Sequence, residues 1–434
     1  MTKVPTRPTR PFLELLAAQL RHDVRQAPAA ARRRFSAAAT LERCVNIAEL
    51  RALARRRVPR VVFDYADGAA GDELTAARNQ ADLRRLAVVP HILTGAVDID
   101  VSTTVLGQPV EVPLLGAPTG MTGIVHHDGE IGMARAVHGA GSVYVLSSVG
   151  SRTIEEVAEQ SPGPKWFQLY VSRDRGYVRE LVGRARAAGY LALVLTVDVQ
   201  QSGARERDLR NGFTLPPRLT AQALVQGVVR PRWTIDFVRR ASGSGFLSEI
   251  GERSVRGGGA AVSFADSINR QFDPHLSWSD ISWLQEQWDG PIVLKGVLRA
   301  QDAQQAARIG VAGVIVSNHG GRQLDQAPSS IAALPAVVEA VGSEIEVYMD
   351  GGIRRGVDIV KALALGARAC LAGRALAYGL GAGGAAGAAR AMNLLVAELR
   401  LAMVLAGCGS VRELDSSWLA STLEGEPRAA GSVG

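Results

Sequence analysis

The chain has 434 residues, of which 47% are hydrophobic and 21% are charged. This composition excludes a disordered chain, and the length suits one large domain or two to three ordinary ones. Its three cysteines, Cys44, Cys370 and Cys408, are widely scattered and form no C-x-x-C pair. We therefore expect no metal site and no disulfide framework, which favours a reducing cytoplasm. No signal peptide is recognisable, and no apolar run reaches the roughly 18 residues that a membrane-spanning helix needs.

The net charge of +7 is concentrated in two segments. Residues 1–40 hold eight basic residues against two acidic ones, and residues 199–262 hold ten arginines against five acids. Such charge is most often solvated arginine, and the first alternative is contact with an anionic membrane surface. Nucleic acid is excluded as a partner because no nucleic-acid-binding motif accompanies the charge. The localisation that we predict is cytoplasmic, with peripheral contact at the inner face of the cell membrane as the alternative.

In chain order, a basic N-terminal extension (1–40) is followed by helical periodicity from Ile47 to about Arg85. After residue 110, short apolar runs alternate with helical patterns, which is typical of βα units and a parallel sheet. The eight runs are Val112–Ala117, Ser142–Leu146, Trp166–Tyr170, Ala192–Val197, Ile292–Leu294, Gly313–Val316, Glu346–Met349 and Ala369–Ala372. Eight units predict a closed (β/α)8 TIM barrel with an N-terminal helical extension, in a domain spanning 41–420 before a flexible tail (421–434).

One connection in this pattern is far too long for an ordinary βα loop and its helix. About ninety residues separate Asp198 from Pro291, and the middle of the segment, Ser242–Gly259, is rich in glycine and serine. The sequence therefore predicts an insertion after strand 4, at about residues 212–275. A lid or a surface-docking loop is the expected role of such an insertion.

Polar residues follow every apolar run. They are Pro118 to Gly120, Ser147 and Ser148, Gln168 and Tyr170, Thr196 and Asp198, Lys295, Asn318 and His319, Asp350, and Gly373 and Arg374. The carboxyl ends of barrel strands meet at one rim, where the active sites of such barrels lie. Eight polar strand ends together predict a single convergent site.

Five ordered motifs carry a family resemblance: FQLY (167–170), LTVD (195–198), SNHGGRQLD (317–325), DGGIRRG (350–356) and KALALGA (361–367). With them the chain resembles the FMN-dependent α-hydroxy-acid oxidases and dehydrogenases, from about Phe63 to Ala406. The resemblance implies a barrel that binds FMN and oxidises a small L-2-hydroxy acid to the 2-keto acid. It also implies a homo-oligomer, since the family is often tetrameric.

The catalytic roles follow from the resemblance and suit the residue types. His319 is the family's catalytic base, and an imidazole that titrates near neutral pH suits proton removal from the hydroxyl or the α-carbon. Asp198 is expected to stabilise the resulting imidazolium. Tyr170 is expected to hydrogen-bond the substrate through its phenol.

Two arginines, Arg205 and Arg322, correspond to the family's clamp on the substrate carboxylate, because a planar guanidinium binds a carboxylate through two parallel hydrogen bonds. Tyr65 corresponds to a further substrate-binding tyrosine before the barrel. Val149 stands where glycolate oxidases have a tryptophan that lines the pocket. This valine and the Ser202–Arg205 turn resemble bacterial quinone-dependent L-lactate dehydrogenases.

For the flavin, Lys295 is expected to supply positive charge near N1 and O2 of the ring, where the reduced flavin gathers negative charge. The phosphate is expected beyond strands seven and eight, the usual phosphate position in such barrels. The full set of expected FMN contacts is Pro118, Thr119, Gly120, Ser147, Gln168, Thr196, Lys295, Ser317, Asp350, Gly351, Gly352, Arg354, Gly373 and Arg374.

Several alternatives stay open. Electrons pass to a quinone or another acceptor in the leading interpretation and to O2 in the oxidase alternative. The substrate is L-lactate in the leading interpretation, with mandelate or a peptide-derived amide as bulkier alternatives. Other interpretations are a nucleotide dehydrogenase with a cysteine nucleophile and a flavin-binding protein without activity. The first lacks a cysteine on the active rim, and the second is disfavoured because the expected catalytic set is complete.

Overall fold

The computed structural model describes residues 37–215, 226–241, 262–263 and 269–421. Most of the basic N-terminal extension, the Gly/Ser-rich segment Ser242–Gly259 and the predicted tail beyond 421 lie outside these residues. The chain divides into two units, Met1–Val45 and Asn46–Gly434. The first unit contributes helix α2 (Ala37–Glu42), and all other elements belong to the second.

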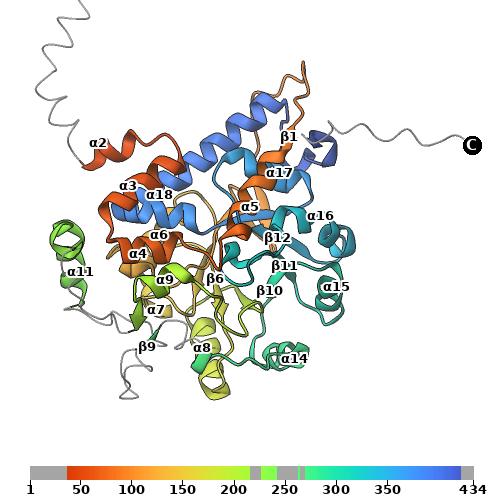
Figure 1. The fold of residues 1–434 in the computed structure, drawn as a ribbon. Coiled ribbons are helices and arrows are strands. Elements are labelled where there is room, and N and C mark those ends of the chain that lie inside the picture. The colour runs from red at the N-terminus through yellow and green to blue at the C-terminus, as the bar shows by residue number, and fades with distance from the viewer. Residues whose placement is uncertain (1–36, 216–225, 242–261, 264–268, 422–434) are drawn as a thin grey trace, which may run out of the picture. The chain divides into compact units, whose positions relative to one another are not determined.

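A closed barrel of eight parallel strands forms the centre of the second unit (Figure 1). In order around the barrel the strands are β4 (Leu114–Gly116), β5 (Tyr144–Ser147), β6 (Lys165–Leu169), β7 (Ala192–Thr196), β10 (Ile292–Val297), β11 (Gly313–Val316), β12 (Glu346–Asp350) and β13 (Ala369–Ala372). These are the eight predicted runs, so the barrel prediction is confirmed. Several boundaries differ by one to three residues. The largest difference is at β10, which continues through Lys295 to Val297 instead of ending at Leu294.

Each barrel strand is followed by a helix. The helices are α6 (Gly129–His138), α7 (Ile154–Gln160), α8 (Arg175–Ala187), α14 (Trp278–Gln287), α15 (Ala300–Arg308), α16 (Ser330–Val341), α17 (Gly356–Ala364) and α18 (Arg374–Ala406). Helix α8 illustrates the local cause, since Asp174 caps it by accepting from the Tyr177 N–H at 3.0 Å. Its buried stripe includes Val178, Leu181 and Val182, at helical spacing.

The helical region predicted from Ile47 to about Arg85 contains α3 (Ile47–Arg57), α4 (Arg60–Asp67) and α5 (Leu74–Arg85). Helix α3 packs on α18, while α5 contacts α16 and the turn after β11. Two of the short antiparallel sheets outside the barrel pair β1 (Leu86–Val88) with β14 (Leu419–Ser421) and β2 (Thr103–Val105) with β3 (Gln108–Val110). The α4–α5 region therefore reaches the end of the barrel where the predicted site lies.

The predicted insertion, at about residues 212–275, lies within the long connection from β7 to α14. The described elements of this connection are α9 (Glu206–Arg210), β8 (Thr214–Leu215), α11 (Pro231–Ala241) and β9 (Val262–Ser263), with β8 and β9 paired antiparallel. Despite this long connection β10 lies next to β7, with Ile292 opposite Leu193. Helix α11 is tied to the loop after β4, since the Trp233 Nε1–H donates to the Ile124 carbonyl at 3.0 Å.

Candidate active site

The carboxyl ends of the barrel strands surround a cleft of about 1240 Å³ that opens to solvent. Most of the predicted site residues line it. These are Tyr65, Pro118, Thr119, Gly120, Val149, Tyr170, Thr196, Arg205, Lys295, His319, Arg322, Asp350, Gly351, Gly352, Arg354, Gly373 and Arg374. The other predicted residues, Asp198, Ser147, Gln168 and Ser317, lie behind this lining and contact it or each other.

The turn after β11 presents His319 in a backbone conformation that is uncommon for a side-chain-bearing residue, with φ at 57°. The His319 N–H donates to Ser317 Oγ at 3.0 Å, and Gly321 N–H donates to Asn318 Oδ1 at 3.1 Å. Asn318 in turn exchanges two amide hydrogen bonds with Asn79 of α5, at 2.8 and 2.9 Å. Backbone strain of this kind persists where its surroundings fix it, and it is concentrated at functional sites.

His319 lies between Asp198 and Tyr170. Its Nδ1 is 3.0 Å from Asp198 Oδ1, and its Nε2 is 3.3 Å from Tyr170 Oη. Burial alone would raise the pKa of Asp198, but His319 and then Lys295 outweigh burial and lower it. The carboxylate can then only accept, so Nδ1 carries the proton and Nε2 faces the cleft as a base. Burial lowers the pKa of His319, against the opposing effect of Asp198.

Lys295 is a buried cation at the floor of the cleft. Its Nζ donates to Ser317 Oγ at 3.0 Å and lies 3.0 Å from Asp350 Oδ2. Burial would lower the pKa of Lys295, but Asp350 and Asp198 outweigh burial and raise it, so the ammonium stays charged. The next residue, Gly296, has φ at 110°, and a Cβ there would lie 2.7 Å from the Asp198 side chain. The absence of a side chain at Gly296 therefore leaves room for the Asp198 side chain beside β10, close to Lys295.

Two guanidinium groups border the open side of the cleft. Arg322 donates through one nitrogen to the carbonyls of Tyr65 and Gly68, at 2.8 and 2.9 Å, and lies over the Tyr65 ring. Arg205 donates to Ser202 Oγ at 3.1 Å. Burial lowers the pKa of Arg205, as does the neighbouring charge of Arg322. Two adjacent guanidiniums repel each other, so an anion between them would be favourable.

Several buried polar atoms around the cleft have no hydrogen-bond partner within the described chain. They are Gln168 Nε2, Thr196 Oγ1, Asp350 Oδ1 and Arg374 Nε. Buried polar groups are normally paired, so these atoms mark positions where a polar ligand belongs. Gly351 and Gly352 have φ of 92° and 93° in the loop that precedes α17. The loop continues to Arg355, and α17 begins at Gly356. Donors, a buried cation and a glycine loop fit the ring, ribityl chain and phosphate of FMN.

A closed (β/α)8 barrel with a histidine–aspartate pair, a buried lysine and an arginine-lined cleft defines a barrel oxidoreductase of the flavin-dependent kind. The family model described as FMN-dependent dehydrogenase matches residues 54–421. The chain belongs to this family, so it is an FMN-dependent enzyme, and the predictions of family, fold and cofactor are confirmed.

The curated relatives include an L-lactate oxidase from Nostoc sp., 44% identical over 379 residues, which cover 86% of this chain and 98% of the relative. An L-lactate dehydrogenase from Caulobacter vibrioides is also 44% identical, over 88% of this chain and 98% of its own length. Among solved structures, a monotopic membrane protein, (S)-mandelate dehydrogenase, superposes with a TM-score of 0.80 at 37% identity. That match covers 87% of this chain and all of the other.

Sequence reasoning missed residues that hold the site together without lining it. The Asn79–Asn318 amide pair is one example, and Glu130 is another, because its buried carboxylate accepts from the backbone of Thr122 and Ser151 at 3.0 and 2.8 Å. Asn318 belongs to the SNHGGRQLD motif, but its partner Asn79 and Glu130 belong to none of the quoted motifs. Three potential metal ligands, His126, His127 and Asp128, lie within 4.8 Å of one another, so the absence of a metal site stays a prediction.

Proposed function

We propose that the enzyme oxidises a small L-2-hydroxy acid, with L-lactate the preferred substrate, to the 2-keto acid. The observation that carries the proposal is His319, whose Nδ1 is 3.0 Å from Asp198 and whose Nε2 faces the cleft that Arg205 and Arg322 also line. A base and two carboxylate-binding groups in one cleft match the two polar ends of a 2-hydroxy acid. The relatives named L-lactate oxidase and L-lactate dehydrogenase, both 44% identical, support the same substrate.

In this proposal Arg205 and Arg322 bind the substrate carboxylate, and Tyr65 and Tyr170 offer phenols to its polar groups. His319 Nε2 takes the proton, and the Asp198 carboxylate stabilises the imidazolium that forms. FMN held in this cleft would supply the acceptor for the two electrons of this oxidation. Burial of His319 keeps the imidazole neutral, and thus basic, at neutral pH.

For the cofactor, we assign the ammonium of Lys295 to the N1 and O2 side of the ring, where it stays charged through Asp350. Arg354 and Arg374 are assigned to the phosphate, together with the Gly351–Gly352 loop. Burial lowers the pKa of Arg374 to about 10, so it remains cationic at neutral pH. Asp350 is assigned to the ribityl chain. The remaining ring contacts are Pro118, Thr119, Gly120, Ser147, Gln168, Thr196, Ser317 and Gly373.

Substrate size depends on Val149, which lines the cleft above Gly120. A Cβ on Gly120 would lie 2.5 Å from Val149 Cγ2, so the two residues are in close contact. A valine leaves more room than the tryptophan of glycolate oxidases, which favours lactate and also admits larger acids. The similarity to (S)-mandelate dehydrogenase makes mandelate the second candidate.

Transfer of the electrons to a quinone, at the membrane surface, completes the proposal. Four apolar residues in and before α11 are at least half exposed: Val228, Val229, Ile235 and Val238. With the exposed Arg232 of the same helix they form an amphipathic surface suited to lipid headgroups. No described helix has the length and apolar character to span a bilayer. Peripheral membrane contact, an otherwise cytoplasmic location and a homotetramer are parts of this proposal.

The test is steady-state turnover of the purified holoenzyme with L-lactate, D-lactate and (S)-mandelate, each with a quinone analogue or with air as the acceptor. We expect the highest kcat/KM with L-lactate and the quinone analogue. Faster turnover in air, with one peroxide formed per pyruvate, would overturn the quinone proposal in favour of an oxidase. Preference for (S)-mandelate would overturn the assignment of L-lactate and leave the reaction class intact.

A further inference from the structure

A group of ion pairs centred on Asp67 lies beside the substrate arginines and lines no part of the cleft. Asp67, at the end of α4, has a side chain only 4% exposed. Its carboxylate accepts two hydrogen bonds from Arg51, at 2.6 and 2.7 Å, and one from Tyr378 Oη at 2.7 Å. Burial alone would raise the pKa of Asp67, but these donors outweigh burial and lower it. Asp67 is therefore a fixed anion.

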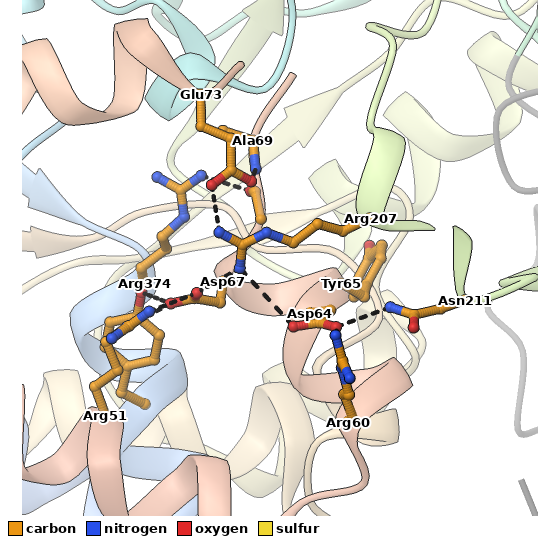
Figure 2. A network of polar contacts seen from close by, with 12 residues as sticks. Arg51, Arg60, Asp64, Tyr65, Asp67, Ala69, Glu73, Arg207, Asn211 and Arg374 are labelled. Atoms are coloured by element: carbon orange, nitrogen blue, oxygen red, sulfur yellow. Dashed lines mark hydrogen bonds and ion pairs between the residues drawn. The ribbon is translucent and has the colours of Figure 1, made fainter. Parts of the chain in front are cut away.

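Arg207 extends this group of ion pairs to helix α9. Figure 2 shows its guanidinium between three carboxylates. It donates to Asp67 Oδ2 at 2.9 Å and to Glu73, and it lies 3.8 Å from Asp64 Oδ1. Arg207 is on α9, while all three carboxylates come from the α4–α5 region. The Arg207 side chain thus ties helix α9 to the region of helices α4 and α5.

The two segments joined by Arg207 carry the substrate-binding groups. Arg205 is the N-cap residue of α9, two positions before Arg207. On the other side, the carbonyls of Tyr65 and Gly68 accept from Arg322. The backbone adds two further links between these turns, from Gly71 N–H to Ala204 O at 3.0 Å and from Ala70 N–H to Gly321 O at 2.8 Å.

The Gly68 carbonyl also connects substrate and cofactor groups. It accepts from Arg322 at 2.9 Å and from Arg374 at 2.8 Å. In the proposed function Arg322 binds the substrate carboxylate and Arg374 binds the FMN phosphate. Gly68 directly follows Asp67, whose carboxylate is fixed by Arg51 and Arg207. The position of one carbonyl, and with it two guanidiniums, therefore depends on the ion pairs around Asp67.

We propose that Arg207 is a positioning residue for substrate binding, which sets the separation of Arg205 and Arg322 by pairing α9 with Asp67 and Glu73. This inference rests on the proposed carboxylate-binding role of those two arginines. Because Arg207 contacts no residue of the proton-transfer set, its loss should weaken carboxylate binding and leave the chemical step almost unchanged.

The test is R207Q in the FMN-loaded full chain, with R210Q as the matched control on the same helix. Arg210 is exposed and pairs with Glu206 within α9, so its loss removes a charge without untying the helix. We expect R207Q to raise KM for L-lactate about tenfold while kcat changes less than about threefold, since small misplacements of binding groups have such effects. R207K should restore most of the loss, because it keeps the charge opposite Asp67.

Oxalate, a dicarboxylate without an oxidisable hydrogen, gives a readout independent of turnover. Its Kd, measured by titration against the flavin spectrum, should rise about tenfold in R207Q and less than about twofold in R210Q. If R207Q does not fold, E73Q removes one partner of Arg207 and should raise the oxalate Kd about threefold. Unchanged oxalate affinity in the folded variant would overturn the proposal.

The two proposals fail in different ways. A wild-type holoenzyme that binds oxalate but is reduced by no 2-hydroxy acid would overturn the proposed function. The oxalate Kd of R207Q would then still decide whether Arg207 positions the two carboxylate-binding arginines. A wild-type enzyme that binds neither compound would overturn both. An equal fall of kcat and kcat/KM in R207Q would place Arg207 in the chemical step and contradict a positioning role.

Discussion

Two layers of the barrel interior differ sharply although the same strands build them. On three strands a step of two residues, which keeps a side chain on the same face, leads from an apolar layer to a polar one. The steps are Trp166 to Gln168, Tyr348 to Asp350 and Val293 to Lys295. The first member of each pair belongs to the buried apolar cluster, and the second lies at or next to the cleft.

The apolar layer is complete in itself, while the polar layer is not. Trp166 and Tyr348 pack edge to face with ring centroids 5.5 Å apart, an arrangement that stabilises a core. In the polar layer, Gln168 Nε2 and Asp350 Oδ1 are buried without a partner in the described chain. From this difference we infer that the apolar layer supplies the folding free energy, whereas the polar layer is arranged to bind a ligand. The predictions below separate the two.

The largest effect is expected from H319Q, in the polar layer. Loss of the base should lower the rate of flavin reduction by L-lactate by about 10²–10⁴-fold, the usual contribution of a general base. The free energy of unfolding should change little, since the His319 side chain lies at the cleft. Stopped-flow absorbance and urea unfolding measure the two quantities. A variant that keeps a tenth of the wild-type rate would contradict the assignment of the base.

W166A is the corresponding change in the apolar layer. It should lower the free energy of unfolding by about 3–5 kcal/mol, the usual cost of truncating a buried tryptophan. The folded, FMN-loaded fraction should still turn over L-lactate at a rate near that of the wild type. Denaturant unfolding and flavin-normalised kcat test this separation. A selective loss of kcat without loss of stability would show that the two layers are not independent.

R322K removes bidentate binding and keeps the charge. We expect kcat/KM for L-lactate to fall about 10²-fold, or roughly 2.7 kcal/mol, because lysine binds a carboxylate as a point charge. Flavin content, measured spectroscopically, should stay at the wild-type level because Arg322 lies on the substrate side. Equal activity of the variant and the wild type would remove Arg322 from the clamp.

The smallest effect is on the pH profile of the wild type. Burial lowers the pKa of His319, so the neutral base persists as the pH falls through the ordinary imidazole range. The acid limb of kcat/KM, which reports the free enzyme, should therefore lie below the usual histidine pKa. Rates measured across a buffer series locate the limb. An acid limb above the usual histidine value would show that the aspartate dominates over burial.

The sequence predicted the barrel well because each layer leaves a local signal. Apolar strands such as Gly313–Val316 and the polar residues that follow them stand next to each other in the chain. The predicted cleft residues likewise follow strand ends, so their convergence follows from the barrel itself.

Contacts between distant segments were the part that the sequence could not predict. Asn79 and Asn318 form their amide pair across 239 residues, and Arg207 meets Asp67 across 140. Their residue types are common on surfaces, and only the folded chain brings them together. The predicted end of β10 at Leu294 was also wrong. A lysine is expected to end a buried strand, but β10 continues through Lys295 because buried partners such as Asp350 keep its ammonium charged.

The most direct test of the central claim is a single anaerobic mixing of the FMN-loaded wild type with L-lactate, with D-lactate as the control. We predict that L-lactate bleaches the flavin absorbance fully and that D-lactate leaves it unchanged, because the arginine clamp and His319 Nε2 together select one enantiomer of the substrate. An FMN-loaded enzyme that L-lactate and the other L-2-hydroxy acids leave oxidised would contradict the account.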